Sequence, residues 1–149
     1  MLRIYLDNCC LNRPFDDQNQ LRIKVESDII ISILESFKTK TSFWVGSEVI
    51  QIEINKTQNT ERRKKVEAFL IFQNSVVKIN EPLINRAKNI ERFGFSFMDA
   101  LHLESAIAGK ADIFITTDDE IIKIFRKVSD SFNIKVISPI DFMNLEKKR

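Results

Sequence analysis

The chain has 149 residues, of which 44% are hydrophobic and 30% charged, and its formal net charge is +2. This composition is typical of a globular protein, and no apolar run approaches the roughly 20 residues that cross a membrane. The first residues lack the apolar core of a signal peptide, so we expect one cytoplasmic domain over residues 1–149 that does not bind a membrane.

Short apolar or β-branched runs alternate along the chain with longer amphipathic stretches. We expect strands over residues 2–6, 41–45, 76–79, 112–115 and 135–137. We expect helices over residues 20–37, 47–56, 61–72, 82–92, 97–109 and 118–128. This alternation predicts βαβ units with right-handed crossovers, and therefore a mostly parallel sheet covered by helices. The predicted fold class is α/β, with three layers.

Carboxylates follow the ends of several predicted strands. Asp7 comes directly after the first strand, Glu48 and Glu53 follow the second, and Asp118 follows the fourth. Asp99 lies in the first turn of the helix that precedes the fourth strand. Ligands of open parallel sheets bind beyond the carboxyl ends of the strands, so we expect these side chains to gather at one edge. Like charges this close raise each other's pKa, and a hard divalent cation is the natural group to neutralise them.

Each of these carboxylates also has a purely structural explanation. Aspartate is common where a strand breaks into a turn and at the start of a helix. The spacing of Ser96 and Asp99 is that of a helix capping box, although Asp99 shares the helix face that should meet the sheet. Glu48 lies in the first turn of its helix, where acidic residues are common, whereas Glu53 lies on the apolar side. Glu53 is therefore the stronger candidate, and Glu48 stays open.

The tandem cysteines Cys9 and Cys10 follow Asp7 and could be mistaken for the reactive groups of this loop. Sequence neighbours are poor candidates for a disulfide, and we expect one of the two to pack inward beside Leu11 as a small hydrophobic residue. A nucleophilic thiolate would need a nearby histidine, but His102 lies in a helix with no predicted link to this loop. We expect His102 to be a partly buried helix residue rather than a catalytic group.

Four segments of the chain carry a family resemblance, in the order IYLDNC, SEVIQIEI, FMDALHLESA and FITTDDE. Together they resemble the PIN-domain family of metal-dependent ribonucleases over nearly the whole chain, and FMDALHLESA with FITTD is the specific part. The resemblance implies a parallel sheet of about five strands with helices on both faces. It places the acidic quartet of the family at Asp7, Glu53, Asp99 and Asp118, with Mg²⁺ or Mn²⁺ as the cofactor. We expect Asp7, Asp99 and Asp118 to be ligands of the cation, and Glu53 to be a further ligand or to orient one.

The resemblance also implies a substrate and partners. PIN-domain proteins cleave RNA, and many small bacterial members are VapC-type toxins that a cognate antitoxin holds inactive, often as homodimers. Asn8 stands where the family commonly has Thr or Ser, and it can still bind a metal-bound water or a phosphate. Arg13 can bring a guanidinium to a phosphate, and Thr116 or Thr117 can orient a carboxylate or contact phosphate. The loop around Arg13 is not part of the family pattern, so its role is open.

Two other functions fit parts of the sequence. A PIN-like module that binds RNA or a protein without cleaving would not need the complete acidic quartet. An aspartate-based phosphatase also has an aspartate after its first parallel strand, but it normally has a second one two residues later, where this chain has Cys9. We therefore predict an endoribonuclease that uses Mg²⁺ or Mn²⁺, with RNA as substrate and with an antitoxin and a second copy of the chain as candidate partners.

Overall fold

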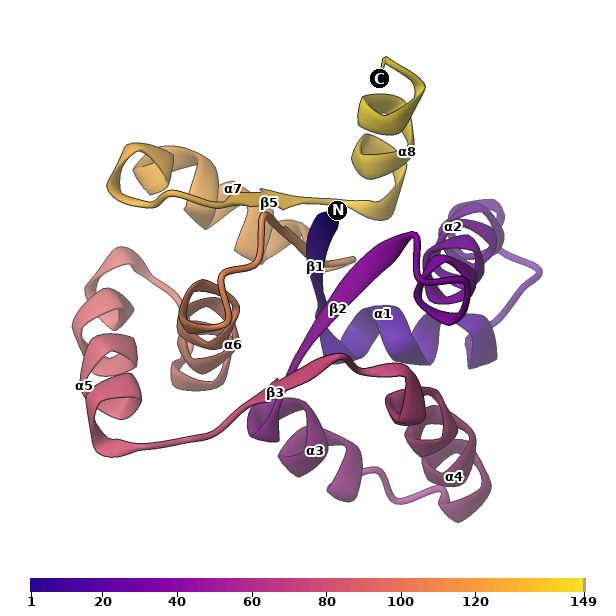
Figure 1. Ribbon diagram of the computed structural model, residues 1–149, viewed down its shortest axis with the longest axis horizontal. Coiled ribbons are helices and arrows are strands. Elements are labelled where there is room, and N and C mark those ends of the chain that lie inside the picture. The colour runs from indigo at the N-terminus through magenta and orange to yellow at the C-terminus, as the bar shows by residue number, and fades with distance from the viewer. Residues whose placement is uncertain (149) are drawn as a thin grey trace.

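The computed structural model describes residues 1–148 and has a central sheet with helices on both faces (Figure 1). Five strands pair in parallel in the order β3-β2-β1-β4-β5. Their bounds are β1 (Leu2–Leu6), β2 (Ser42–Ser47), β3 (Ser75–Val77), β4 (Ile113–Ile115) and β5 (Lys135–Ile137). The predicted α/β class, the parallel sheet and the three layers are confirmed.

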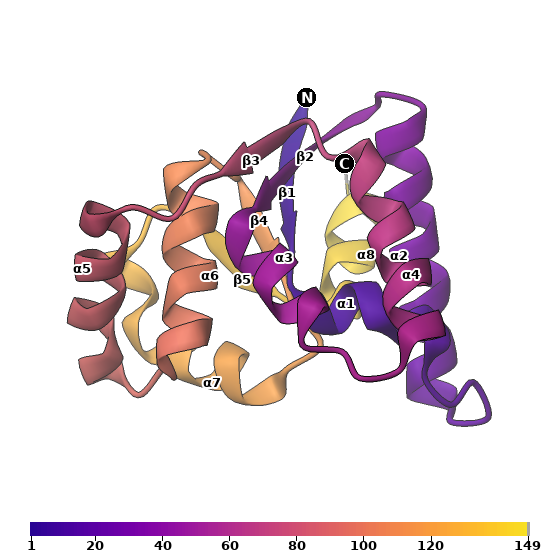
Figure 2. The same ribbon diagram turned by 90° about the horizontal axis from the view of Figure 1, so that it is seen from below.

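Helices α5, α6 and α7 lie on one face of the sheet, and α2, α4 and α8 lie on the other (Figure 1 and Figure 2). The α-helices are α1 (Asn8–Asn12), α2 (Leu21–Lys38), α3 (Glu48–Asn55), α4 (Thr60–Phe69), α5 (Glu81–Ile90), α6 (Phe97–Ala108), α7 (Asp119–Val128) and α8 (Pro139–Lys147). The short 3₁₀ turns are η1 (Arg13–Phe15), η2 (Leu70–Phe72), η3 (Glu91–Phe93) and η4 (Ser129–Ser131). Within residues 1–148, every helix is too short or too polar to span a lipid bilayer.

All six predicted helices are present, and two further helices were not predicted from the sequence. Helix α1 has only 5 residues, which is too short to show a helical period. Helix α8 begins at Pro139, and the Ser138 hydroxyl caps it by accepting a hydrogen bond from the Asp141 N–H. This Ser-Pro start is a typical helix signal that the sequence interpretation did not use.

The direction in which the chain adds strands to the sheet reverses at β1, in the centre of the sheet. From β1 the chain builds β2 and β3 on one side, and it then crosses to build β4 and β5 on the other. At such a point a crevice opens beyond the carboxyl ends of the strands. The Asp7 N–H donates to the Ile115 carbonyl at 3.0 Å, so the ends of β1 and β4 lie side by side. The residues that follow these two strands therefore meet at one edge.

Both faces of the sheet are buried, as a parallel sheet requires. On the face covered by α2, the Trp44 ring stacks on Phe37 with a centroid distance of 5.0 Å. On the face covered by α6, the Tyr5 ring stacks on Phe114 at 5.2 Å. Helix α6, which carries the candidate residue Asp99, is thus packed on a buried aromatic layer.

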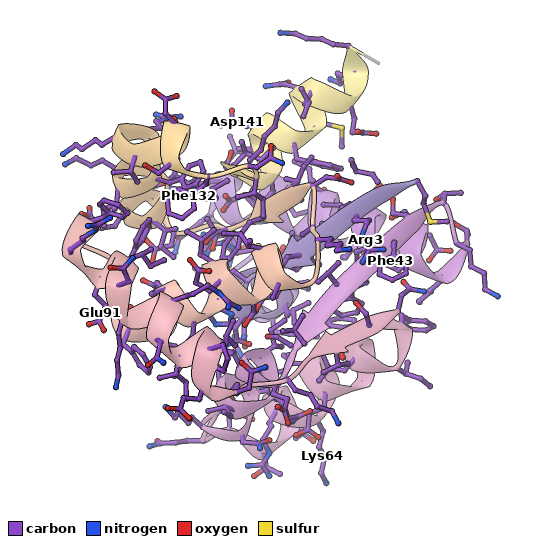
Figure 3. The ribbon with its side chains drawn as sticks, turned by 60° about the vertical axis from the view of Figure 1, so that its left-hand side comes forward. Arg3, Phe43, Lys64, Glu91, Phe132 and Asp141 are labelled. Carbon is purple, nitrogen blue, oxygen red and sulfur yellow. The ribbon has the colours of Figure 1, made fainter. Side chains whose placement is uncertain are left out.

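The end of α6 is held close to the sheet by Gly109 and Arg3. A Cβ atom on Gly109 would lie 2.3 Å from Cγ1 of Val45, so a larger residue would push the helix end away. Arg3 donates from Nε and Nη2 to the carbonyls of Lys110 and Gly109 at 3.0 and 2.8 Å. Its guanidinium lies 4.0 Å from the centroid of the Phe43 ring (Figure 3). A cation at a helix C-terminus also stabilises the helix dipole, so α6 has a fixed position on the sheet.

The variant Gly109→Ala is expected to lower the free energy of unfolding by about 1–3 kcal/mol, because the extra methyl group overpacks the contact with Val45. Urea denaturation measures this change. The matched control is Ala108→Ser, at an exposed position of the same helix end, with an expected change of less than about 0.5 kcal/mol. Equal effects of the two variants would show that close approach at Gly109 is not what holds α6.

Candidate functional site

Asp7 is fixed at the end of β1 by hydrogen bonds from two segments. Its Oδ1 accepts the Asn8 N–H at 2.7 Å, and its Oδ2 accepts the Thr116 hydroxyl at 2.9 Å. The same Thr116 oxygen accepts the Asp118 N–H at 3.0 Å. Thr116 therefore holds the Asp7 carboxylate in one orientation and joins it to the turn that carries Asp118.

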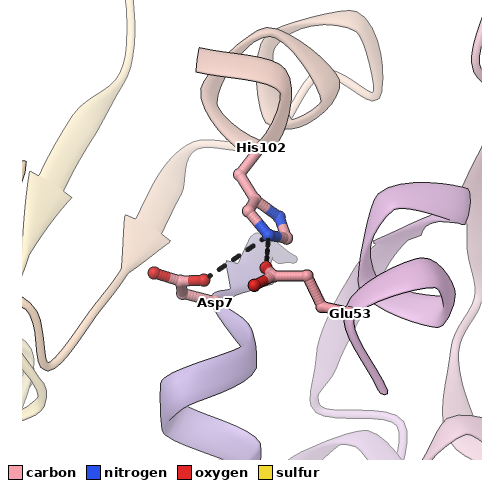
Figure 4. Close-up of side chains that lie close together, drawn as sticks. All are labelled: Asp7, Glu53 and His102. Carbon is pink, nitrogen blue, oxygen red and sulfur yellow. Dashed lines mark hydrogen bonds and ion pairs between the residues drawn. The ribbon is translucent and has the colours of Figure 1, made fainter. Parts of the chain in front are cut away.

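Three side chains from separate segments meet at this point (Figure 4). His102 of α6 forms a hydrogen bond through Nε2 with Oε1 of Glu53 on α3, and Nε2 lies 3.7 Å from Oδ1 of Asp7. One potential ligand atom from each of the three residues lies within 4.8 Å of the other two. His102 and Asp7 are buried, whereas the Glu53 side chain is 29% exposed, so the cluster reaches the surface beside Glu53.

Asp99 and Asp118 lie beside this cluster, outside the group of three. Asp99 lies in the first turn of α6, where its N–H donates to the Ser96 hydroxyl at 3.1 Å, as the capping box predicted. Asp118 caps α7, and its Oδ1 accepts the Glu120 N–H at 2.9 Å. Partial burial raises the pKa of Asp99, and the negative charges of Asp7 and Asp118 raise it further. The carboxylates are therefore close enough to act on one another.

In the described part of the chain, histidine is the one basic residue type that pairs with these carboxylates. Within residues 1–148, no lysine or arginine forms an ion pair with Asp7, Glu53, Asp99 or Asp118, and His102 is the cationic partner that two of them have. Carboxylate oxygens are the ligands that Mg²⁺ and Mn²⁺ prefer. The donor set therefore fits a hard divalent cation.

The two glutamates of α3 point to different places. The Glu48 carboxylate accepts the Ile79 N–H at 2.7 Å, which ties the start of α3 to the segment that follows β3. Glu53, one and a half turns later, faces His102. Of the two candidates that the sequence left open, the structure places Glu53 beside Asp7.

Arg13 is occupied by carboxylates. Its Nη2 lies 2.9 Å from Oε1 of Glu26, and its Nη1 lies 3.3 Å from Oδ2 of Asp16. Glu26 is fully buried on α2, so Arg13 neutralises a charge that would otherwise be very costly to bury. The proposed contact between Arg13 and a phosphate stays a prediction.

The residues of α1, which follow Asp7, form hydrogen bonds within the helix and with the turn after β4. The Asn8 side-chain oxygen accepts a hydrogen bond from the Asn12 amide at 3.2 Å, and the Thr117 N–H donates to Sγ of Cys9 at 3.4 Å. Cys10 is fully buried, and its burial raises the pKa of the thiol well above the ordinary value. The expectation that one cysteine packs inward is confirmed, and the substrate contacts of Asn8 and Thr117 stay predictions.

His102 is the site residue that the sequence interpretation missed. It was expected to be partly buried and unconnected to the loop after β1, but it is fully buried and contacts Glu53 beside Asp7. A signal was available, because His102 follows Asp99 by three residues and shares its helix face. The prediction that Asp99 faces the sheet therefore applies to His102 as well.

The surroundings of His102 favour its protonated form. Burial alone would lower the pKa of the imidazole, but the hydrogen bond to Glu53 and the charges of Asp7 and Asp99 outweigh this effect. The pKa of His102 is therefore raised above the usual value of about 6.5. Without a metal ion, an imidazolium here supplies the local counter-charge.

This raised pKa gives a pH dependence that can be measured. Because the folded state binds the proton more tightly than the unfolded state, His102 contributes full stability below about pH 6.5, and this contribution is lost as the pH rises through the folded pKa. Unfolding free energies of the wild type and of His102→Gln, measured in EDTA from about pH 5 to about pH 9, are expected to differ most at low pH. A difference that is independent of pH would contradict the raised pKa.

Comparisons with known proteins give a match in structure. No protein-family model matches the chain, and no curated protein matches its sequence. The fold is similar to that of a chain in the crystal structure of VapBC2 from Rickettsia felis bound to a DNA fragment from their promoter. The match has 15% sequence identity and a TM-score of 0.59, and it covers 92% of this chain and 98% of that chain. At this identity the likeness concerns the fold, so this protein shares its α/β architecture with a chain of the VapBC2 structure.

Proposed function

We propose that this protein is a metal-dependent endoribonuclease that hydrolyses RNA phosphodiester bonds with Mg²⁺ or Mn²⁺. The observation that carries the proposal is the meeting of carboxylates from separate segments at the carboxyl edge of the sheet, with no lysine or arginine partner within residues 1–148. The likeness in fold to a chain of the VapBC2 structure supports it, as does the resemblance of FMDALHLESA and FITTD to the PIN-domain family.

The side chains of the site have distinct tasks in this proposal. Asp7 and Glu53 would hold the cation, and Asp99 and Asp118 would add negative charge that strengthens its attraction. When bound, a divalent ion would supply the positive charge that activates a water molecule and neutralises the scissile phosphate. Thr116 keeps the Asp7 carboxylate oriented, which preserves the geometry that a cation needs.

The alternatives have less support. A non-cleaving RNA-binding or protein-binding module would gain nothing from the charges of Asp7 and Asp118, which raise the pKa of the partly buried Asp99. An aspartate-based phosphatase would need a second aspartate where this chain has Cys9, and the sulfur of Cys9 lies 3.4 Å from the Thr116 hydroxyl. The nuclease is therefore the function that we put to the test.

Asp7→Asn and Asp99→Asn are each expected to reduce Mg²⁺-dependent or Mn²⁺-dependent cleavage of mixed RNAs by about 100-fold or more, because each removes negative charge that attracts the cation. Gel electrophoresis of labelled RNA measures the rate. EDTA is expected to abolish cleavage by the wild type. By family analogy, the products carry 5′-phosphate and 3′-hydroxyl ends.

The matched control for these variants is Asp130→Asn. Asp130 is exposed in η4, which precedes β5 and therefore lies toward the opposite edge of the sheet. This variant is expected to keep the wild-type rate. Cleavage that persists in EDTA, or that survives both site substitutions, would disprove the proposed function.

We further propose that the protein is the toxin of a toxin–antitoxin pair, with a cognate antitoxin as its partner. The likeness in fold to a chain of the VapBC2 structure supports this assignment. A homodimer and a cytoplasmic location also stay predictions, and the exposed apolar side chains of Leu21, Val25 and Ile31 on α2 would suit a dimer contact.

Expression of the wild-type chain in a bacterial host is expected to slow growth, because uncontrolled cleavage removes RNAs that the cell needs. Asp7→Asn, expressed to the same level, is expected to leave growth unchanged, and Asp130→Asn is expected to slow it like the wild type. Growth curves with parallel immunoblots measure the effect. Normal growth of cells that contain active enzyme would indicate a processing nuclease instead of a toxin.

A further inference from the structure

A buried row of hydrogen-bonded polar side chains adjoins Glu53 of the candidate metal site, and the proposed function does not account for it. The Tyr5 hydroxyl lies 2.6 Å from Nδ1 of His102 and 2.7 Å from the Ser47 hydroxyl. On the other side of the imidazole, Nε2 reaches the Glu53 carboxylate. Tyr5, His102 and Ser47 are each at most 2% exposed, so bulk water does not compete for these hydrogen bonds.

Strand β1, the end of β2 and helix α6 contribute the side chains of this row. Tyr5 precedes Asp7 by two residues, and in a strand such residues project from the same face of the sheet. Ser47 ends β2 and caps α3, because its hydroxyl oxygen accepts the Ile50 N–H at 3.2 Å. One hydroxyl thus fixes the start of the helix that carries Glu53 and also holds the tyrosine that contacts His102.

Hydrogen-bond chemistry sets the direction of the contact between His102 and Glu53. An ionised carboxylate can only accept, so the proton of this bond belongs to Nε2 of His102. A nitrogen that carries a proton has no lone pair for a cation. Nε2 of His102 is therefore a donor to Glu53, although its position alone would also suit a metal ligand.

We propose that His102 is a positioning residue for the metal site, and that Tyr5 and Ser47 hold it in place. His102 donates Nε2–H to Glu53 and keeps this carboxylate turned toward Asp7, while the Tyr5 hydroxyl fixes the ring through Nδ1. This inference rests on the proposed metal-dependent function. Removal of a residue that orients a metal-binding side chain typically lowers the metal affinity by about 10-fold to 100-fold.

The first test measures Mn²⁺ binding by electron paramagnetic resonance, without any RNA. Tyr5→Phe keeps the ring that stacks on Phe114 and removes only the hydroxyl, and we expect it to weaken Mn²⁺ binding by about 10-fold or more. The matched control is Ser105→Ala on α6, which removes a buried hydroxyl that has no hydrogen-bond partner in the part of the chain that the structure describes. We expect this control to bind Mn²⁺ like the wild type.

The outcomes of this test separate the two proposals. Unchanged affinity in Tyr5→Phe, with a wild type that binds Mn²⁺, would overturn the role of Tyr5 and His102 and leave the nuclease proposal intact. A wild type that binds no Mn²⁺ would overturn the proposed function itself. Near-ultraviolet circular dichroism of each variant checks that its packing is native.

The second test asks whether His102 acts as a donor or as a ligand, and it does not depend on how well Tyr5→Phe folds. Glutamine carries an amide N–H near the position of Nε2 but offers no nitrogen lone pair to a cation. We therefore expect His102→Gln to keep most of the Mn²⁺ affinity, and His102→Ala to lose about 10-fold to 100-fold. Equal losses in the two variants would overturn the proposal.

Nuclear magnetic resonance gives an independent readout, because His102 is the single histidine of the chain and its imidazole signals need no assignment. In the Mg²⁺-loaded wild type, ¹⁵N chemical shifts are expected to show a proton on Nε2. An Nε2 without a proton would mean that this nitrogen faces the cation as a ligand, and the positioning role would then be wrong.

Discussion

Electrostatic repulsion among carboxylates is the constraint around which this molecule is arranged. Asp7, Glu53, Asp99 and Asp118 would separate if they were free, and the parallel sheet with its crossovers holds them at one edge. Nearby arginines do not relieve the repulsion, because Arg13 is paired with Glu26 and Arg22 lies 2.8 Å from Asp119. Those pairs stabilise the surrounding helices and leave the site itself negative, which is the condition for attracting a cation.

The fold was predictable because parallel sheets follow strong local rules. Buried strands read as short apolar runs, amphipathic helices show a 3.6-residue period, and the crossovers have one hand. The same rules place Asp7 and Asp118 directly after strands of the predicted sheet. Helix α1 was not predicted because 5 residues cannot display a helical period.

The contacts within the site were less predictable, because they depend on distances between helices that are remote in sequence. Glu48 and Glu53 are five residues apart on α3. Glu48 accepts the Ile79 N–H because the segment after β3 lies beside the start of α3, and the sequence does not reveal this arrangement. Arg13 finds Glu26 on a different helix, which no local pattern indicates. His102 lies on the same helix face as Asp99, but its contact with Glu53 requires the packing of α6 against α3.

The hydrogen bonds of Thr116 have a consequence for the synthesis of the protein. Thr116 lies after β4, and its hydroxyl joins Asp7 from the first strand to the turn of Asp118, which is formed more than a hundred residues later. When only β1, β2 and β3 have left the ribosome, the nascent chain lacks this hydrogen bond. It also lacks the side chains of Asp99 and Asp118. The candidate site is therefore complete only once nearly the whole chain has folded, and a chain that ends before β4 lacks it.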